Sequence, residues 1–259
     1  MKVIILCGGM GTRLREETEY KPKPMVEIGG KPILWHIMKI YAHYGYKEFI
    51  LALGYKGDVI RDYFLNYYSY NNDFTVQLGN KEKIVVHNNH NEQDWKVTLV
   101  ETGDESMTGY RVKVAGKYVT EHNFMLTYGD AVADVNINKI VNYHNEMDKI
   151  GTVTGVYPPS RFGDLIVDKG MVTKFKEKKK DIANQMPING GFFVFKKEFL
   201  DLIPNDPKID LEGKPIEHIT EKKQLAVFNH PGFWQSMDTF REYQLLNNLW
   251  KENPIWKVW

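Results

Sequence analysis

A glycine-rich segment near the N-terminus has the residue types of a phosphate-binding turn. Gly8, Gly9 and Gly11 follow the apolar run 2–7, which we expect to form a buried strand. Glycines let the backbone approach an anion closely, and successive N–H groups in such a turn form a nest for phosphate oxygens. Arg13 adds a guanidinium suited to two-pronged contact with phosphate. Taken alone, the segment is weak evidence for such a site, because a tight turn can have the same residues.

The glycine spacing separates this segment from two commoner phosphate loops. The third glycine of a G-x-G-x-x-G pattern would stand at position 14, which is Leu14. No Gly-Lys-Ser/Thr follows at the spacing of a P-loop. A dinucleotide-dependent dehydrogenase is therefore disfavoured.

A second cationic motif, Lys21-Pro22-Lys23-Pro24-Met25, follows shortly afterwards. The two prolines restrict the backbone around Lys23 and should hold it extended. A rigid loop that carries a cation suits phosphoryl transfer, in which developing negative charge must be stabilised. On its own, however, the motif is better explained as a solvated basic turn.

Two aspartates far apart in sequence could share a metal ion. Asp130 ends the segment Thr127-Tyr128-Gly129-Asp130 after an expected strand, and Asp238 precedes the helical run 240–250. Each alone is explained as a turn or helix cap. Mg²⁺ commonly takes one or two protein carboxylates, with water and substrate phosphates completing its shell. The histidines are scattered and the single cysteine is isolated, so the sequence does not suggest zinc.

Three further segments have structural explanations of their own. Residues 100–111 read as a loop with a helix start, and residues 174–181 as a solvated charged loop. Residues 188–193 place two glycines at the entry of an aromatic strand, which permits close approach of a ligand. Trp234 could stack on a sugar or simply fill the core.

The elements that would position these residues alternate between strand and helix. This alternation predicts an α/β fold with a mostly parallel central sheet, in which ligands bind outside the carboxyl ends of the strands. We expect strands at 2–7, 48–53, 124–127 and 151–156, and helices at 33–44, 59–67, 138–146 and 240–250.

Two stretches depart from this alternation. Residues 66–96 are rich in Asn and Tyr and should form a loop or hairpin excursion, either a mobile surface insertion or a subunit contact. From residue 157 the expected strands are shorter, at 164–168, 171–176 and 191–195. We interpret them as a small lobe on the same sheet.

Composition excludes several classes of function. The chain of 259 residues has 34 Lys and Arg against 33 Asp and Glu, which gives no support for nucleic acid or a membrane surface as partner. Its one cysteine, Cys7, allows no intrachain disulfide and fits the cytoplasm. The N-terminal apolar run is too short for a signal peptide or a membrane span.

Together, the segments GGMGTRL and KPKPMVEIGGKPILWH resemble the nucleotidyltransferase family that makes nucleotide sugars. The resemblance covers almost the whole chain and is strongest to the branch that joins CTP and glucose 1-phosphate. It implies one Rossmann-like domain over 1–259, with a nucleotide-binding half at 1–156 and a sugar-binding half at 157–259. It also implies Mg²⁺ as cofactor, a homo-oligomer such as a hexamer, and a role in supplying CDP-glucose for surface polysaccharide.

The resemblance assigns roles to individual residues. Catalytic roles fall on Arg13, Lys23 and Lys178, and the metal ligands are Asp130 and Asp238. The nucleotide would be bound by Leu6, Gly8, Gly9, Gly11, Thr12, Arg13, Lys23, Thr102, Ser106, Arg111 and Gly129. The sugar would be bound by Tyr128, Glu177, Lys178, Asn189, Gly190 and Trp234.

The sequence departs from the family pattern at three positions. Cys7 stands where alanine is usual and should be a small buried residue, Tyr110 replaces a glycine, and Lys179 replaces the proline of a Glu-Lys-Pro motif. Base choice depends on backbone contacts that sequence does not reveal, so the same chemistry with UTP or dTTP stays open. A non-catalytic relative that binds nucleotide sugars is a further alternative.

Overall fold

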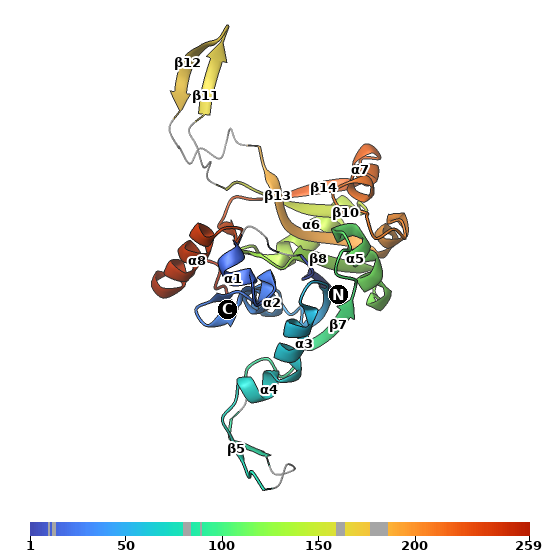
Figure 1. The fold of residues 1–259 in the computed structure, drawn as a ribbon. Helices are drawn as coiled ribbons and strands as arrows, with labels where there is room; N and C mark the ends of the chain where they lie inside the picture. The colour runs from blue at the N-terminus through green and yellow to red at the C-terminus, as the bar shows by residue number, and fades with distance from the viewer. Residues whose placement is uncertain (10, 12–13, 80–83, 89, 159–163, 177–185) are drawn as a thin grey trace.

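The computed structural model describes the chain except for residues 10, 12–13, 80–83, 89, 159–163 and 177–185. Within the described residues, seven strands form one central sheet (Figure 1). In spatial order they are β14 (Leu225–His230), β10 (Gly151–Val156), β13 (Ile188–Lys196), β8 (Asn123–Tyr128), β1 (Val3–Leu6), β4 (Glu48–Leu53) and β7 (Lys96–Glu101).

The sheet is mixed but mostly parallel, as predicted. β1 pairs in parallel with both β4 and β8, and β4 pairs in parallel with β7. β10 and β14 are also parallel, whereas β13 runs antiparallel between β8 and β10. The carboxyl ends of β1, β4, β7 and β8 therefore meet at one edge of the sheet, where ligands of such folds bind.

Helices cover both faces of the sheet because side chains alternate along each strand. Val3 and Ile5 of β1 belong to one core cluster, and Ile4 and Leu6 belong to the other. The first cluster is completed by α2 (Ile33–His43), α3 (Gly57–Leu65), α6 (Ile137–Met147) and α8 (Phe240–Glu252). The second is completed by α5 (Thr108–Ala115) and α7 (Lys214–Glu221).

The predicted helices are confirmed, with ends that shift by about two residues. One detail of α8 is different from expectation. Its N-cap is Thr239, whose hydroxyl accepts from the Glu242 backbone N–H while the Glu242 carboxylate accepts from the Thr239 N–H. This capping box supplies the cap without Asp238, so the helix-cap explanation of Asp238 is wrong.

Short elements connect the larger ones. They are α1 (Arg15–Thr18), η2 (Lys23–Met25), β2 (Glu27–Ile28), β3 (Lys31–Pro32), α4 (Tyr67–Tyr70), η3 (Gly116–Tyr118), β9 (Ala131–Ala133), η5 (Lys197–Leu202) and β15 (Trp234–Ser236). In the part of the chain that is described, no helix has the length and apolar character to cross a bilayer.

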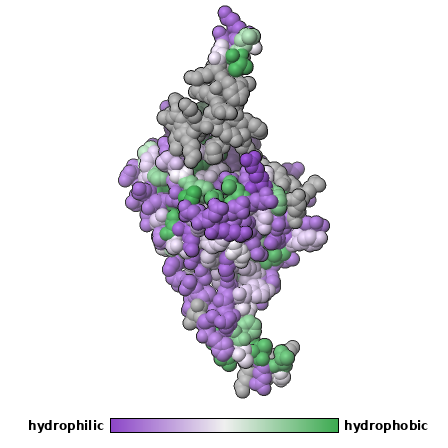
Figure 2. Space-filling model, turned by 90° about the vertical axis from the view of Figure 1, so that its left-hand side faces the viewer, coloured by the Kyte–Doolittle hydropathy of each residue, from purple (hydrophilic) through white to green (hydrophobic). Residues whose placement is uncertain are grey.

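The excursion at 66–96 contains a hairpin, which was one of the two predicted forms. β5 (Phe74–Val76) pairs antiparallel with β6 (Ile84–Val86). The hairpin projects from the body at the end opposite β11 and β12 (Figure 1). Its apolar side chains are exposed, with Leu78 at 92% and Ile84 at 57%, and they colour the lower tip green in Figure 2.

The prediction that all strands after residue 157 join the central sheet is wrong. β11 (Asp164–Asp168) and β12 (Met171–Lys176) form a separate antiparallel pair that projects from the body (Figure 1). Lys169 and Gly170 both have positive φ, at 46° and 83°, which is the backbone of a two-residue turn that suits a hairpin. The two strands therefore pair with each other, and β13 returns to the sheet.

Candidate active site

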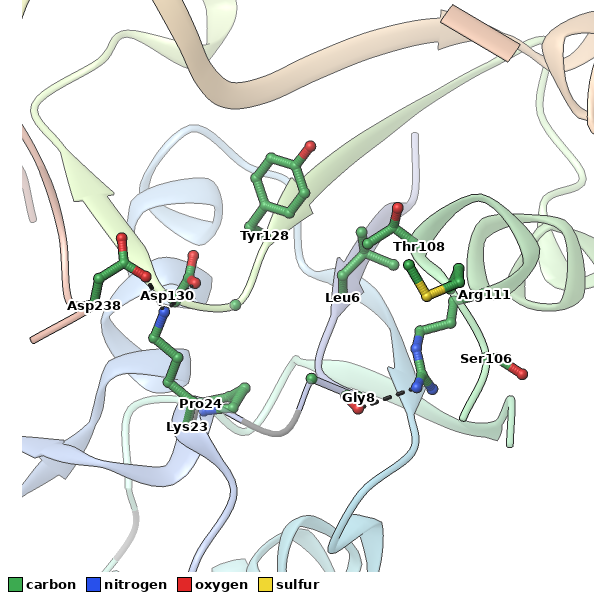
Figure 3. A pocket seen from close by; sticks show the side chains of 14 residues that line it. Leu6, Gly8, Lys23, Pro24, Ser106, Thr108, Arg111, Tyr128, Asp130 and Asp238 are labelled. Atoms are coloured by element: carbon green, nitrogen blue, oxygen red, sulfur yellow. Dashed lines mark hydrogen bonds and ion pairs between the residues drawn. The ribbon is translucent and has the colours of Figure 1, made fainter. Parts of the chain in front are cut away.

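A cleft of about 370 Å³ opens at the carboxyl ends of β1 and β8 (Figure 3). Eleven of the residues assigned by resemblance line it: Leu6, Gly8, Gly9, Gly11, Lys23, Ser106, Arg111, Tyr128, Gly129, Asp130 and Asp238. Pro24, Met107 and Thr108 complete its lining. The predicted clustering of glycine turn, cation and acids at this edge of the sheet is therefore what the structure has.

A small two-stranded sheet brings the two aspartates together. Asp130 follows β8 and is continuous with β9, which pairs antiparallel with β15 so that Ala131 lies opposite Ser236. The Met237 N–H also donates to the Asp130 carbonyl at 2.8 Å. Asp238 is thus delivered beside Asp130 from more than a hundred residues further along the chain.

Lys23 lies between the two carboxylates (Figure 3). Its Nζ is 2.6 Å from Asp130 Oδ2 and 2.7 Å from Asp238 Oδ1, so the two carboxylate oxygens are separated by no more than the sum of these distances. Burial lowers the pKa of Lys23, but the two carboxylates outweigh it and the pKa is raised above its ordinary value. We call these three residues the charged end of the cleft.

The carboxylates at the charged end fit a divalent cation of the hard, oxygen-preferring kind. Among the described residues there is no group of three or more His, Cys, Asp or Glu side chains that could enclose a metal. Two carboxylates are nonetheless the donor set that Mg²⁺ usually takes when substrate phosphates and water supply the rest.

The glycine turn is shaped by its neighbours. A Cβ at Gly8 would lie 2.2 Å from Nη1 of Arg111, and Gly11 has a φ of +61°, so both positions require glycine. Gly9 has open space around its Cβ position. Cys7, just before the turn, is fully buried, and burial raises its pKa, which confirms that it is a packed residue and leaves its thiol protonated.

The backbone around Lys23 differs from the predicted extended form. Pro22 is extended, but Lys23–Met25 forms a single 3₁₀ turn in which Pro24 occupies an early position. Proline is well tolerated in a first turn because its missing N–H would have no partner there. The turn directs the Lys23 side chain toward the aspartates.

Arg111 is more deeply involved in the structure than its predicted contact with nucleotide requires. Its side chain is buried and donates to the carbonyls of Leu53, Gly8 and Asp104 and to Thr102 Oγ1, at 2.6 to 3.1 Å. Burial lowers its pKa from the ordinary value. The guanidinium therefore ties the ends of β1, β4 and β7 together beneath the cleft.

Thr102 lies behind Arg111 and is absent from the described cleft lining. Its hydroxyl donates to the Leu53 carbonyl and accepts from Arg111. The structure thus places Thr102 where it supports Arg111.

A second group of residues, which we call the Tyr128 end, consists of the Tyr128 phenol, which lines the cleft, and its hydrogen-bond partners Asn189 and Glu212. The Tyr128 phenol accepts from Asn189 Nδ2 at 3.4 Å and donates to Glu212. Burial, followed by the Glu212 carboxylate, raises the pKa of Tyr128, so the phenol is protonated. The Tyr128 ring packs against Gly191, which has a φ of +79°. A Cβ at Gly191 would lie only 2.5 Å from this ring.

Asn189, Gly190 and Trp234 lie close to this end without lining the cleft itself, as far as the described residues show. Asn189 Oδ1 accepts from the Gly191 N–H at 2.9 Å, and Trp234 Nε1 donates to the Gly190 carbonyl at 2.8 Å. Trp234 also packs partly buried against the core. Of the two explanations given for Trp234, packing against the core is the one that these contacts fit.

Four of the assigned residues lie outside the described residues. They are Thr12 and Arg13 of the glycine turn and Glu177 and Lys178 of the charged loop, and the departure at Lys179 lies there too.

Glu212 was not found by sequence reasoning. It stands in Asp210-Leu211-Glu212-Gly213, before α7, where an exposed acidic residue would usually be a solvated side chain. The only available signal was the Gly-Lys-Pro that starts α7 and fixes the preceding loop.

A glycine turn, a partly buried lysine and paired acids at the ends of parallel strands define a site for phosphoryl-group chemistry on a nucleotide. The chain belongs to the nucleotidyl transferase family, whose model matches residues 2–249. Members of this family generally use a divalent metal ion.

Individual relatives are similar over their full length. The chain is 48% identical to glucose-1-phosphate cytidylyltransferase of Salmonella typhi, with 100% of both chains covered. It is 42% identical to probable glucose-1-phosphate cytidylyltransferase of Bacillus subtilis, again with 100% of both covered. The crystal structure of HddC from Yersinia pseudotuberculosis shares the fold, with a TM-score of 0.68, 24% identity and coverage of 96% and 99%.

Proposed function

We propose that this enzyme transfers CMP from CTP to α-D-glucose 1-phosphate, giving CDP-glucose and pyrophosphate. The observation that carries the proposal is the full-length identity of 48% to a glucose-1-phosphate cytidylyltransferase. Lys23, Asp130 and Asp238 lie together in one cleft, which supports this chemistry. A lysine and a metal ion held by two aspartates would together neutralise the negative charge of a triphosphate.

Asp130 and Asp238 are the residues that would hold Mg²⁺, the metal that we propose for this site. When bound, the ion neutralises phosphate oxygens and orients the triphosphate. The choice of Mg²⁺ is supported by the chemistry of the donors, since two carboxylates leave room for phosphate and water in an octahedral shell.

The other residues of the cleft bind, orient and neutralise. The glycine turn offers backbone N–H groups to the triphosphate, and Lys23 carries the positive charge beside it. The attacking oxygen of glucose 1-phosphate is already an anion, so no strong general base is needed. We propose in-line attack on the α-phosphorus with catalysis by positioning and charge neutralisation.

The proposal retains the two halves predicted from sequence. Residues 1–156 would bind the nucleotide, with Thr12, Arg13, Ser106 and Arg111 among its contacts. Residues 157–259 would bind the sugar phosphate, with Glu177 and Lys178 on the hexose and its phosphate, together with Tyr128 from the first half.

The test is release of pyrophosphate with CTP, UTP, dTTP and GTP, each paired with glucose 1-phosphate. We expect CTP to be preferred by at least about tenfold in kcat/KM, a difference of about 1.4 kcal/mol. Preference for UTP or dTTP would keep the chemistry and overturn the base assignment. Binding of CDP-glucose in isothermal titration without turnover under any pairing would favour a non-catalytic relative.

The proposal also includes a homo-oligomer in the cytoplasm. The exposed apolar side chains of the β5–β6 hairpin, among them Phe74, Val76 and Val85, supply surface that a second copy could cover (Figure 2). The single cysteine is consistent with a reducing compartment. Size-exclusion chromatography with light scattering measures the number of subunits, and a hexamer is the expected result.

A further inference from the structure

Glu212 is hydrogen-bonded to two residues that line the cleft. Its Oε1 accepts a hydrogen bond from the phenol of Tyr128, the last residue of β8. Its Oε2 accepts one, at 3.3 Å, from the hydroxyl of Thr108, the first residue of α5. Tyr128 and Thr108 both line the cleft. A residue of the second half of the chain thus connects two elements of the first half.

The loop that carries Glu212 is fixed by its backbone. The N–H groups of Met107 and Tyr110 donate to the carbonyls of Pro207 and Ile209 at 2.8 and 3.2 Å, and the Leu211 N–H donates to Thr108 Oγ1 at 2.9 Å. Leu211 itself is fully buried. Gly109 allows this approach, because a Cβ there would lie 2.9 Å from the Ile209 carbonyl oxygen.

The carboxylate is therefore held in place although it is exposed. In the described part of the chain no lysine, arginine or histidine forms an ion pair with it. The Thr108 hydroxyl also lies 3.4 Å from Asp210 Oδ1 and so has two carboxylate acceptors, whereas the Tyr128 phenol donates to Glu212. Hydrogen bonds to a charged acceptor are stronger than neutral ones, so Glu212 fixes the direction of the phenol. Hydroxyl groups of this kind recognise polyhydroxylated ligands.

We propose that Glu212 is a positioning residue for the sugar substrate, acting through the Tyr128 phenol. The proposal rests on the proposed function, because it requires a hexose 1-phosphate to bind at the Tyr128 end. It assigns to the loop before α7 a part in sugar selectivity.

The test is a double-mutant cycle of Glu212→Ala and Tyr128→Phe. Each single variant should raise the KM for glucose 1-phosphate roughly tenfold, with kcat and the KM for CTP within about twofold, because a charged hydrogen bond is lost on the sugar side only. The double variant should be no worse than either single one. Glu221→Gln, an exposed acid at the end of α7, is the matched control.

An unchanged KM for the sugar phosphate in Glu212→Ala, or additive effects in the double variant, would overturn the proposal. So would an equal rise in both KM values. If Glu212→Ala does not fold, Glu212→Gln keeps one acceptor and should give a smaller rise of the same kind. Isothermal titration with glucose 1-phosphate alone separates failure of this proposal from failure of the proposed reaction.

A different observation concerns Lys23. Its ammonium contacts one oxygen of each proposed metal ligand, at 2.6 and 2.7 Å, and its side chain is only 12% exposed. An ammonium and a divalent cation both need these carboxylates, and two cations at bonding distance from the same oxygens repel each other strongly in a partly buried site.

The charge balance shows when this competition ends. Among the described residues at this end, two carboxylates and one ammonium sum to a single negative charge, which is a weak site for a divalent ion that must also shed water. A triphosphate brings several negative charges and gives the ammonium a second partner. Lys23 can then turn from the aspartates toward the phosphates.

We infer that Lys23 competes with free divalent metal for Asp130 and Asp238, so that metal and nucleotide bind with positive coupling. This inference also rests on the proposed function. By thermodynamic linkage, the metal must raise the affinity for nucleotide by the same factor that nucleotide raises the affinity for metal.

The test is a Mn²⁺ titration followed by electron paramagnetic resonance, with no substrate present. We expect Lys23→Met to bind one Mn²⁺ at least about tenfold more tightly than the unaltered protein, because the competing charge is gone. Adding Asp238→Asn should abolish the gain. Lys21→Met, in the same loop, should leave Mn²⁺ binding unchanged.

Equal Mn²⁺ affinity in Lys23→Met and the unaltered protein would overturn the inference, as would a gain that survives Asp238→Asn. Lys23→Gln provides a second variant should the methionine form fail to fold. Because the titration uses no nucleotide or sugar, its result is independent of whether the proposed reaction is correct.

Discussion

The charged end and the Tyr128 end of the cleft are built in different ways. At the charged end, Lys23, Asp130 and Asp238 meet through ion pairs, and the aspartates are set by the backbone pairing of β9 with β15. At the Tyr128 end, a phenol, an amide and an exposed carboxylate are joined by hydrogen bonds across three separate loops and strand ends.

This difference suggests that the two ends of the cleft have different functions in the reaction. Charged side chains held in place by the sheet can stabilise the charge that develops in the transition state. Loss of a residue at the charged end should therefore lower kcat. Hydrogen bonds at the Tyr128 end suit recognition, and their loss should raise the KM of one substrate. The variants below are ordered from the largest expected effect to the smallest.

Asp130→Asn should lower kcat by roughly 10³-fold, because an amide replaces a charged metal ligand while the side chain keeps its shape. Pyrophosphate release measures the loss, and the melting temperature should stay close to that of the unaltered protein. Asp201→Asn, an exposed acid in η5, is the control. Ordinary activity of Asp130→Asn at ordinary magnesium concentrations would contradict the role of the charged end.

Gly8→Ala and Gly9→Ala form a matched pair in the glycine turn. The first places a methyl group 2.2 Å from the Arg111 guanidinium, and we expect a loss of about 1 to 3 kcal/mol in the free energy of unfolding. The second has open space, so stability should be unchanged while the KM for CTP rises. Denaturant titration distinguishes them, and equal stability of the two variants would count against the packing described for Arg111.

The pH dependence of stability tests the core that supports the charged end. Burial lowers the pKa of His36 to about 4, from 6.5; its Nε2 hydrogen-bonds the Ile28 carbonyl and its Nδ1 accepts from Trp256. Below pH 6.5 the unfolded chain binds a proton that the folded chain does not. Stability should therefore fall between pH 6.5 and about 4, by at most about 3 kcal/mol from this group.

His36→Gln should remove that part of the pH dependence and leave the part due to His144, whose pKa burial also lowers to about 4. Denaturant titration at pH 7 and pH 5 makes the comparison. The same decrease in stability in both proteins would contradict the assignment to His36.

Trp234→Phe should have the smallest effect, at the Tyr128 end. It removes the hydrogen bond to the Gly190 carbonyl but keeps an aromatic ring, so we expect a loss of about 1 kcal/mol in stability. The KM for glucose 1-phosphate should change less than in Tyr128→Phe. A larger rise than in Tyr128→Phe would indicate that Trp234 contacts the sugar directly.

Local patterns in the sequence were enough to predict the main sheet and its helices. The apolar run before Gly8 and the alternation of strand and helix identified β1, β4, β8 and β10, because buried parallel strands are continuous in apolar residues. The edge at which Asp130 lies followed from the same reasoning.

Features that depend on distant contacts could not be predicted in this way. The pairing of β9 with β15 joins short segments with no strand-like pattern, and Glu212 acquires its partners through the loop that packs on Gly109. The strands β11 and β12 were predicted correctly, but they were assigned to the central sheet, and they form a separate pair. Their turn residues determine only that the two strands pair with each other. Sequence also does not show which carbonyls a guanidinium meets, so the hydrogen bonds from Arg111 to Leu53 and Gly8 were not predicted.

The most direct test of the central claim is a crystal structure with CTP and Mn²⁺, in which anomalous scattering locates the metal. We predict one Mn²⁺ at bonding distance, about 2.1 Å, from carboxylate oxygens of both Asp130 and Asp238, with Lys23 turned onto the triphosphate. A metal bound elsewhere, with Lys23 still between the two aspartates, would contradict the account.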